Sequence, residues 1–388
     1  MQYRKHKELN ISEIGVGLYS LSGVYGTKDI NEFEKMILKA YELGVNFFDT
    51  AETYGNAEQI VGKIFKPFRK NVYIATKVGI KDGIKPNLSK EYVKKACEDS
   101  LKNLKTDYID LYQIHFDDPE RSIDEIILTF EELIKEGKIL HYGVGHLSKE
   151  RIEEFCKKGK IFSILMELSA VAYDSREKLL PLCEKYDVGA IAFSTTGRGI
   201  LTGKINKETK FEPNDIRNMD PLFQREKFDS SLRVYEKLKE IAKKYKKTST
   251  QIAINWVLSQ PGIICALTGP SNVIHLEENV KASDFKISQD DLNDIEQFLK
   301  EENERLKISQ KFSIKDILLN PLPENPSKAF TDLVYVIETS ILLGLITEEK
   351  IISTFYELFS IRKSLNDINS IEKLKNIQFQ LRDLITID

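Results

Sequence analysis

The sequence predicts an α/β fold, a (β/α)₈ TIM barrel followed by a small α-helical C-terminal extension. Short apolar segments alternate with amphipathic helices, which is the pattern of a parallel sheet covered on both faces. The alternation gives eight strand candidates, and eight favours closure into a barrel over an open sheet. The pattern changes near residue 301, so we expect a barrel domain over residues 1–300 and an extension of unknown role over residues 301–388.

The strand candidates are apolar runs rich in β-branched and aromatic residues. They comprise residues 14–18, 45–48, 72–77, 108–115, 139–144, 162–167, 189–193 and 263–268. Between them we expect helices over residues 29–44, 57–65, 89–104, 122–137, from 148 onward, 177–186, 232–245 and 251–258. Capping residues support the helix starts. The capping boxes pair Asp29 with Glu32, Ser122 with Glu125 and Thr248 with Gln251, and Ser89 and Ser148 cap two further helices.

The extension begins with a linker that Pro321, Pro323 and Pro326 punctuate. Three helices follow, over residues 328–343, 348–362 and 371–384; Gly344 ends the first, and Thr347 and Ser370 cap the others. Their apolar faces must be buried, so we expect them to pack on the barrel exterior or to form a homo-oligomer contact.

Composition excludes several classes of protein. The chain has 388 residues, 30% of them charged, and a net charge of −3, which does not indicate a nucleic-acid surface. The four cysteines are scattered and the N-terminus lacks an apolar stretch, so we expect reduced thiols in a cytoplasmic protein without a signal peptide. The longest apolar run, residues 333–346, is too short to span a bilayer, and no histidine pair suggests a metal site.

Four polar residues lie at the C-terminal ends of three successive strand candidates or in the loop that follows. They are Asp49, Tyr54, Lys77 and His115. In a barrel, these ends surround one mouth, where catalytic residues gather. Each residue has an ordinary explanation when taken singly: a helix cap, a packing tyrosine, a solvated lysine and a core histidine. Taken together, they favour an active site.

The segments that carry these residues, FFDTAETYG, IATKV and DLYQIH, resemble the active-site segments of the aldo-keto reductases. Further similar segments follow in the family's order, among them GKILHYGVGHLSKERIEEF, LLPLCEKYDVGAIAFSTTGRGILTGK and TSTQIAINWVLSQPGI. The resemblance runs from about residue 14 to about residue 299. It implies that Tyr54 is the acid, that Lys77 lowers its pKa, that Asp49 anchors Lys77, and that His115 orients the substrate oxygen.

The resemblance also implies a nicotinamide cofactor, NADPH or NADH, held without a GxGxxG motif. The loop after the seventh strand and the last helix N-terminus would bind the phosphates. The family positions correspond to Phe193 for nicotinamide stacking, Ser194, Thr196, Arg198 and Gly199 for the pyrophosphate, Ser271 and His275 for the 2′-phosphate, and Glu278 and Asn279 for adenine. Taken singly, the loop could be an ordinary βα turn, and the last two residues a solvated helix face.

Three departures concern the nicotinamide carboxamide and the 2′-phosphate. Gly145 and His146 replace a family Ser-Asn pair, and Leu165 aligns with a family glutamine. Residues 269–275 contain no arginine or lysine, and His275 alone is a weak phosphate clamp. We therefore expect weak or atypical cofactor binding, with His146 as the remaining carboxamide contact, and a reduced preference for NADPH.

These residues predict an oxidoreductase that reduces a small-molecule aldehyde or ketone. An alternative is a non-redox lyase, dehydratase or isomerase that uses the same four residues for proton transfer. A third hypothesis is a regulatory module that binds nucleotide through the barrel. The sequence does not name the substrate, because variable loops determine it.

Overall fold

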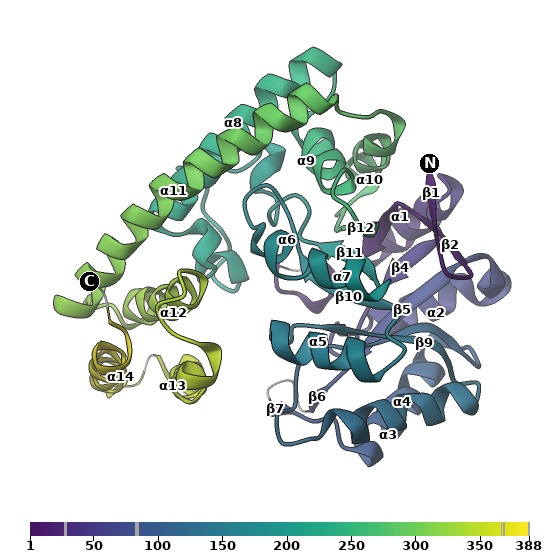
Figure 1. Ribbon diagram of the computed structural model, residues 1–388, viewed down its shortest axis with the longest axis horizontal. Helices are drawn as coiled ribbons and strands as arrows, with labels where there is room; N and C mark the ends of the chain where they lie inside the picture. The colour runs from purple at the N-terminus through teal and green to yellow at the C-terminus, as the bar shows by residue number, and fades with distance from the viewer. Residues whose placement is uncertain (27–28, 82–84, 366, 368, 387–388) are drawn as a thin grey trace. The chain divides into compact units, whose positions relative to one another are not determined.

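The computed structural model describes residues 1–26, 29–81, 85–365, 367 and 369–386. Its central element is a closed barrel of eight parallel strands in the order β10, β11, β12, β3, β4, β5, β8 and β9 (Figure 1). Each strand overlaps one of the eight predicted segments, so the predicted fold class is confirmed. The bounds are β3 (Ile14–Gly17), β4 (Phe47–Asp49), β5 (Tyr73–Val78), β8 (Ile109–Ile114), β9 (Ile139–Gly145), β10 (Ser163–Glu167), β11 (Gly189–Phe193) and β12 (Ile263–Thr268).

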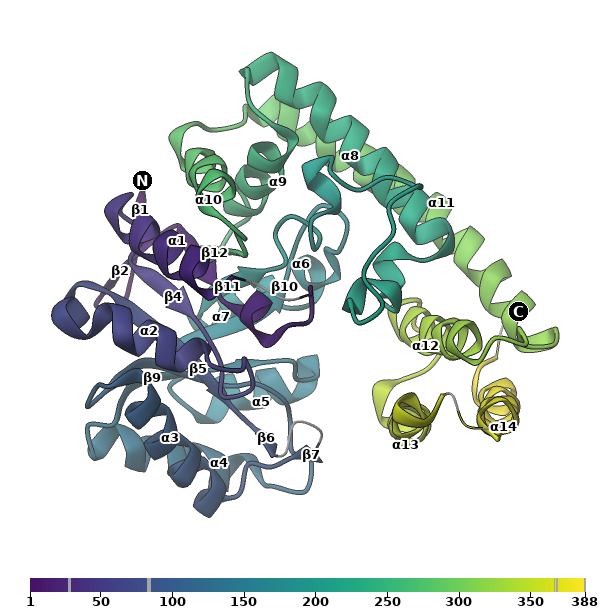
Figure 2. The same ribbon diagram turned by 180° about the vertical axis from the view of Figure 1, so that it is seen from behind.

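Helices cover the outside of the barrel, as both ribbon views show (Figure 1 and Figure 2). Most of them bury one apolar face, which in α1 is Phe33, Met36, Ile37 and Ala40. The exceptions are α9, which is buried along its whole length, and α6, which has no buried residue. The helices of this part of the chain are α1 (Ile30–Glu42), α2 (Ala57–Phe65), α3 (Lys90–Leu104), α4 (Ile123–Lys135), α5 (Lys149–Lys158), α6 (Asp174–Lys178), α7 (Leu180–Tyr186), α9 (Ser249–Leu258) and α10 (Val273–Val280).

Some local predictions were wrong. The single helix expected over residues 177–186 is two short helices, α6 and α7, because Pro181 has no backbone N–H and lies in the first turn of α7. Ser370 does not cap α14 (Ser370–Leu384): Asn369 holds the N-cap position, and the Ser370 hydroxyl donates to the carbonyl of Leu365. Ser89 and Thr347 occupy N-cap positions but make no capping hydrogen bond.

An N-terminal hairpin, which the sequence analysis missed, covers the amino end of the barrel strands. It consists of β1 (Tyr3–His6) and β2 (Leu9–Ser12). The Arg4 guanidinium donates to the carbonyl of Ile263, the first residue of β12, and Leu9 and Ile11 join the apolar cluster in the barrel interior. The hairpin therefore closes the end opposite to the predicted site.

The chain divides into two compact units. One comprises residues 1–206 and 238–292, and the other comprises residues 207–237 and 293–388. Residues 207–237, which lie inside the predicted barrel range of 1–300, thus group with the C-terminal helices. Helices α8 (Arg225–Tyr245) and α11 (Gln289–Leu319) each contain residues of both units.

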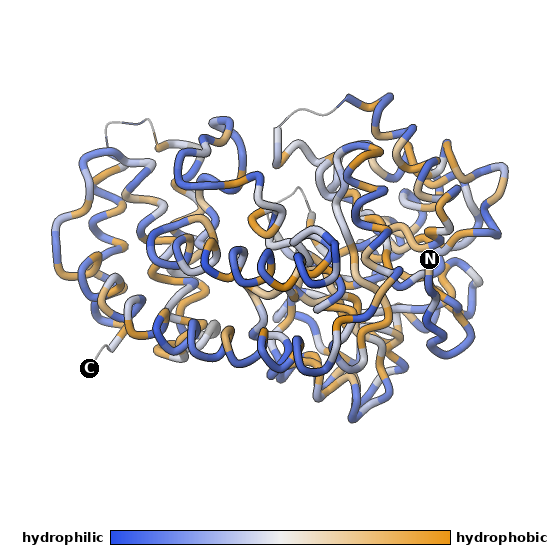
Figure 3. Tube along the Cα trace, turned by 90° about the horizontal axis from the view of Figure 1, so that it is seen from above, coloured by the Kyte–Doolittle hydropathy of each residue, from blue (hydrophilic) through white to orange (hydrophobic). Residues whose placement is uncertain are grey.

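The second unit has its own apolar core, built from α11, α12 (Pro326–Leu342), α13 (Glu348–Ile361) and α14. Polar and apolar residues alternate along these helices, as expected when each buries one face (Figure 3). Residues 301–319, for which no helix was predicted, continue α11. The proline-rich segment is a short loop before α12, with Pro326 in the first turn of that helix. Partly buried polar contacts attach residues 207–237 to this core: Arg225 donates to Asp332, and the Tyr335 hydroxyl donates to Glu226.

No helix among the described residues has the length and apolar character needed to cross a bilayer.

Candidate active site

The four predicted catalytic residues lie at one end of the barrel. Asp49 is the last residue of β4, Lys77 is the penultimate residue of β5, and His115 directly follows β8. Tyr54 lies in the loop between β4 and α2. Because β4, β5 and β8 are adjacent parallel strands, their carboxyl ends bring these residues together.

Lys77 is the most enclosed of the four, with 1% of its side chain exposed. Its Nζ donates to Asp49 Oδ1 at 2.5 Å and to the Thr50 carbonyl at 2.7 Å. Gln113, which the sequence analysis did not single out, donates from Nε2 to Asp49 Oδ2 at 3.2 Å. Both carboxylate oxygens are therefore bonded, and the lysine is held in one position.

Burial acts on both charges of this pair. It raises the pKa of Asp49 and lowers the pKa of Lys77, and the attraction between the two groups opposes both shifts. A buried charge without its partner would be strongly unfavourable, so the two side chains depend on each other.

Tyr54 packs directly against this pair. The Lys77 Nζ lies 4.8 Å from the centroid of the Tyr54 ring. Burial raises the pKa of Tyr54 well above its usual value, and the Asp49 carboxylate adds to that rise. The attraction of the Lys77 ammonium for a phenolate therefore does not outweigh burial, and the pKa of Tyr54 lies above its usual value where the resemblance implied a lowered one. The phenol keeps its proton at neutral pH.

His115 completes the cluster, with its ring centroid 5.7 Å from that of Tyr54. Burial lowers its pKa well below the usual value, and Lys77 and His146 add to the effect, so the imidazole is neutral. Nδ1 is buried and has no hydrogen-bond partner among the described residues. A tautomer with the proton on Nε2 avoids burying an unpaired N–H at that position.

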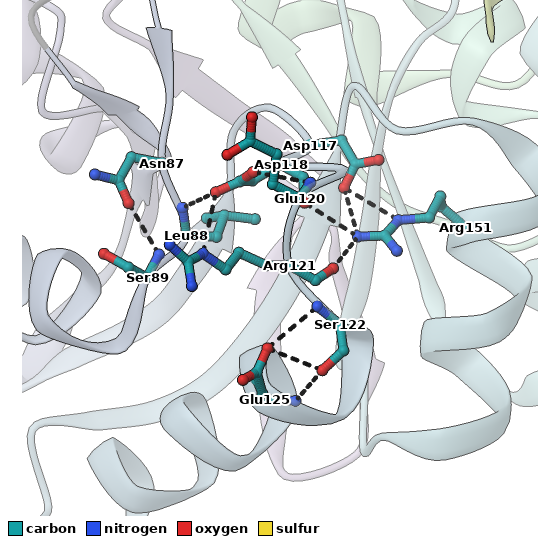
Figure 4. Close-up of polar contacts among 10 residues, drawn as sticks. All are labelled: Asn87, Leu88, Ser89, Asp117, Asp118, Glu120, Arg121, Ser122, Glu125 and Arg151. Carbon is teal, nitrogen blue, oxygen red and sulfur yellow. Dashed lines mark hydrogen bonds and ion pairs between the residues drawn. The ribbon is translucent and has the colours of Figure 1, made fainter.

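The loop that carries His115 into α4 is held from two sides (Figure 4). The Asp118 carboxylate accepts from the backbone N–H of Leu88 at 2.9 Å. The Arg151 guanidinium of α5 donates to Asp117 at 2.9 Å and to the carbonyl of Arg121 at 3.2 Å. These contacts hold the loop that begins directly after His115.

His146 extends the cluster toward the predicted nicotinamide position. Its ring stacks on Phe116 with an interplanar angle of 12°, and its centroid is 5.2 Å from that of Phe193. The preceding Gly145 packs against Leu165: a Cβ added at Gly145 would lie 3.2 Å from the Leu165 Cβ. The two apolar departures from the family pattern therefore complement each other in space.

Desolvation of the ring lowers the pKa of His146, and the positive charges of Lys77 and Arg198 add to that effect. The residue nevertheless keeps a solvent-exposed surface, so water screens these interactions and the shift contributes little to folding stability. The imidazole is neutral at pH 7.

The loop after β11 has the backbone of an anion-binding turn. Ser194, Gly197, Arg198 and Gly199 all have positive φ, and the Thr195 hydroxyl donates to the Leu267 carbonyl at 3.0 Å. Such turns direct successive N–H groups toward one side. The Thr196 side chain is partly exposed, and the Arg198 Nη2 donates to Glu167 Oε2 at 3.0 Å.

The predicted 2′-phosphate residues lie at the start of α10. Ser271 Oγ and His275 Nδ1 are hydrogen-bonded at 2.9 Å. Lys204, from the end of the preceding loop, places its Nζ against His275 Nε2. No cation was predicted here because Lys204 lies 71 residues before His275 in the sequence, outside residues 269–275. Further along α10, Asn279 is buried, and the carbonyl of Glu278 accepts from Gln251.

Within the described ranges, no group of three or more His, Cys, Asp or Glu side chains could hold a metal ion.

Comparison with known proteins gives one family. Its model, described as the aldo/keto reductase family, matches residues 13–300. Probable aldo-keto reductase 1 from Glycine max is 34% identical over 293 residues, covering 74% of this chain and 84% of the relative. Aldo-keto reductase YhdN from Bacillus subtilis is 32% identical over 310 residues, covering 77% and 94%.

Solved structures give the same result. The glycerol dehydrogenase AKR11B4 from Gluconobacter oxydans matches with a TM-score of 0.71 and 26% identity, over 78% of this chain and 96% of that one. The holo form of the aldo-keto reductase AKR11C1 from Bacillus halodurans matches with a TM-score of 0.65 and 30% identity, over 77% and 96%.

Proposed function

The chain belongs to the aldo/keto reductase family and is therefore a carbonyl-reducing oxidoreductase that depends on a nicotinamide cofactor; from this premise we propose which residues carry out the reaction. Tyr54 is the acid that protonates the carbonyl oxygen. Lys77, Asp49 and His115 support that transfer. The family match favours this reaction over the non-redox and regulatory alternatives. The observation that carries the assignment is the buried Lys77–Asp49 pair directly against the Tyr54 ring.

The proton transfer follows from the surroundings of Tyr54. Burial keeps the phenol protonated until a strongly basic alkoxide develops on the substrate. Lys77 neutralises Asp49, whose charge would otherwise make the phenolate still less stable. The neutral His115 donates a hydrogen bond from Nε2 to the same oxygen and orients it. When bound, the reduced nicotinamide supplies a hydride to the carbonyl carbon.

The residues present fit a dinucleotide. The positive-φ loop from Ser194 to Gly199 and the N-terminus of α10 can receive its phosphates, and Phe193 can stack on the nicotinamide. The reaction is tested by following the loss of NADPH absorbance with benzaldehyde and glyceraldehyde as substrates. Glyceraldehyde is included because the chain is similar to a glycerol dehydrogenase. Saturable reduction of either aldehyde supports the proposal, and failure with a broad aldehyde and ketone panel counts against it.

NADPH is the proposed cofactor, because Lys204 supplies the cation that residues 269–275 lack. Lys204→Met should raise the Kd for NADPH about tenfold, at the lower end of the range for a charge-assisted hydrogen bond at an exposed site. The Kd for NADH, which has no 2′-phosphate, should stay within about twofold, so calorimetry with both cofactors contains its own control. Equal weakening of both would place Lys204 elsewhere in the cofactor site.

We further propose a cytoplasmic location, which the four free cysteines support. We also propose that catalysis is confined to the barrel of residues 1–300, without contribution from residues 301–388.

A homo-oligomer through the C-terminal helices is proposed because Ile308, Phe312 and Leu319 are exposed along one face of α11. Light scattering of the natural chain and of Phe312→Asp tests this. A dimer that becomes monomeric in the variant supports the contact, and a monomeric natural chain rules it out.

A further inference from the structure

We propose that Glu167 takes over carboxamide recognition in this chain: its Oε1 accepts a hydrogen bond from the carboxamide NH₂ of the bound nicotinamide. The inference rests on the proposed function, because it requires a nicotinamide against Phe193. It assigns a positioning role to a residue outside the four that handle the proton.

Glu167 lies where a carboxamide contact is needed. It is the last residue of β10, and its register partner on β11 is Phe193. Side chains alternate along a strand, so Glu167 points to the same side as Leu165, which packs in the barrel interior. Glu167 is therefore one layer closer to the mouth than Leu165, which cannot form hydrogen bonds.

The two carboxylate oxygens of Glu167 differ. Oε2 accepts from Arg198 at 3.0 Å, which fixes the carboxylate in one orientation. Oε1 is buried and has no hydrogen-bond partner among the described residues. A buried, unpartnered carboxylate oxygen is costly and is satisfied by a donor from a ligand. The carboxamide NH₂ is such a donor.

The other nearby residues cannot accept from that NH₂ as well as Glu167 can. Gly145 has no side chain and Leu165 is apolar, and they pack against each other. His146 is neutral, and its ring centroid lies 5.2 Å from that of Phe193, the register partner of Glu167. His146 remains available to donate to the carboxamide oxygen, while Glu167 is the acceptor.

The test compares NADPH with its acetylpyridine analogue, in which a methyl group replaces the carboxamide NH₂. The Kd of each is measured by calorimetry for the natural chain, Glu167→Ala and Arg198→Met. The ratio of the two Kd values isolates the NH₂ contact, since any general damage to the site affects both cofactors. Circular dichroism and thermal melting confirm that each variant is folded.

The natural chain should bind NADPH roughly tenfold to a hundredfold more tightly than the analogue, as expected for a hydrogen bond to a charged acceptor. Glu167→Ala should bring the ratio to within about twofold of unity. Arg198→Met should weaken both cofactors and keep most of the ratio, because Glu167 is still present. A ratio unchanged in Glu167→Ala, or near unity in the natural chain, overturns the role of Glu167 alone. If neither nucleotide binds the natural chain, the proposed function fails as well.

Discussion

Tyr54→Phe is expected to lower kcat for aldehyde reduction about 10²- to 10⁴-fold, the usual contribution of a positioned acid. The change removes only the phenol oxygen. The ring keeps its contacts with Tyr19, at 5.1 Å between centroids, and with the Lys77 ammonium, so the fold should be unaffected. The measurement is steady-state turnover with NADPH, together with thermal melting.

Tyr19→Phe is the matched control, because it removes a phenol from the neighbouring ring. Tyr19 does not belong to the group of Asp49, Lys77 and His115 at the strand ends. The turnover of Tyr19→Phe should therefore stay within a few-fold of that of the natural chain. If Tyr19→Phe is the inactive variant and Tyr54→Phe is active, the acid has been assigned to the wrong tyrosine. The KM for aldehyde should change little in Tyr54→Phe, since the lost interaction strengthens mainly in the transition state.

The barrel and its four-residue cluster could be predicted from sequence for a physical reason. Every barrel strand is buried on both faces, so each is a nearly continuous apolar run. The carboxyl ends of parallel strands converge, so polar residues at those ends must meet whatever the intervening loops do. Asp49, Lys77 and His115 are therefore readable from their position in the strand pattern alone.

Contacts between loops could not be predicted in this way. Lys204 and His275 are 71 residues apart and meet only because Arg198, Gly199 and Gly203 adopt positive φ, which turns the loop back toward α10. The spacing of apolar residues does not predict the path of such a loop. Gln113 was not predicted as a site residue because it lies inside a strand, and the sequence does not show that its side chain donates to Asp49.

The C-terminal helices show the same limit at larger scale. The apolar periodicity and the glycine that ends the first helix predicted α12, α13 and α14. The structure places these helices within a few residues of the predicted bounds. The sequence did not predict that residues 207–237 group with these helices, because the grouping depends on side-chain pairs such as Arg225 with Asp332, which are 107 residues apart.

Lys77→Met is expected to lower both the stability and the activity of the protein. The Asp49 carboxylate, 4% exposed, would lose its cation and keep only the hydrogen bond from Gln113. Removing one partner of a buried ion pair typically costs about 3–5 kcal/mol, which urea unfolding would detect as a large fall in midpoint. The unpaired carboxylate would also destabilise the Tyr54 phenolate further, so turnover should fall about 10²-fold or more.

The double variant Asp49→Asn/Lys77→Met separates these two effects. It removes both charges, so no buried ion is left without a partner, and most of the lost stability should return. Turnover should remain low, because the ammonium that offsets developing charge near Tyr54 is still missing. A double variant that regains stability and turnover together would show that Lys77 acts only through folding. A single Lys77→Met variant as stable as the natural chain would mean that Asp49 becomes protonated without cost, and the pair would then not be the anchor of the site.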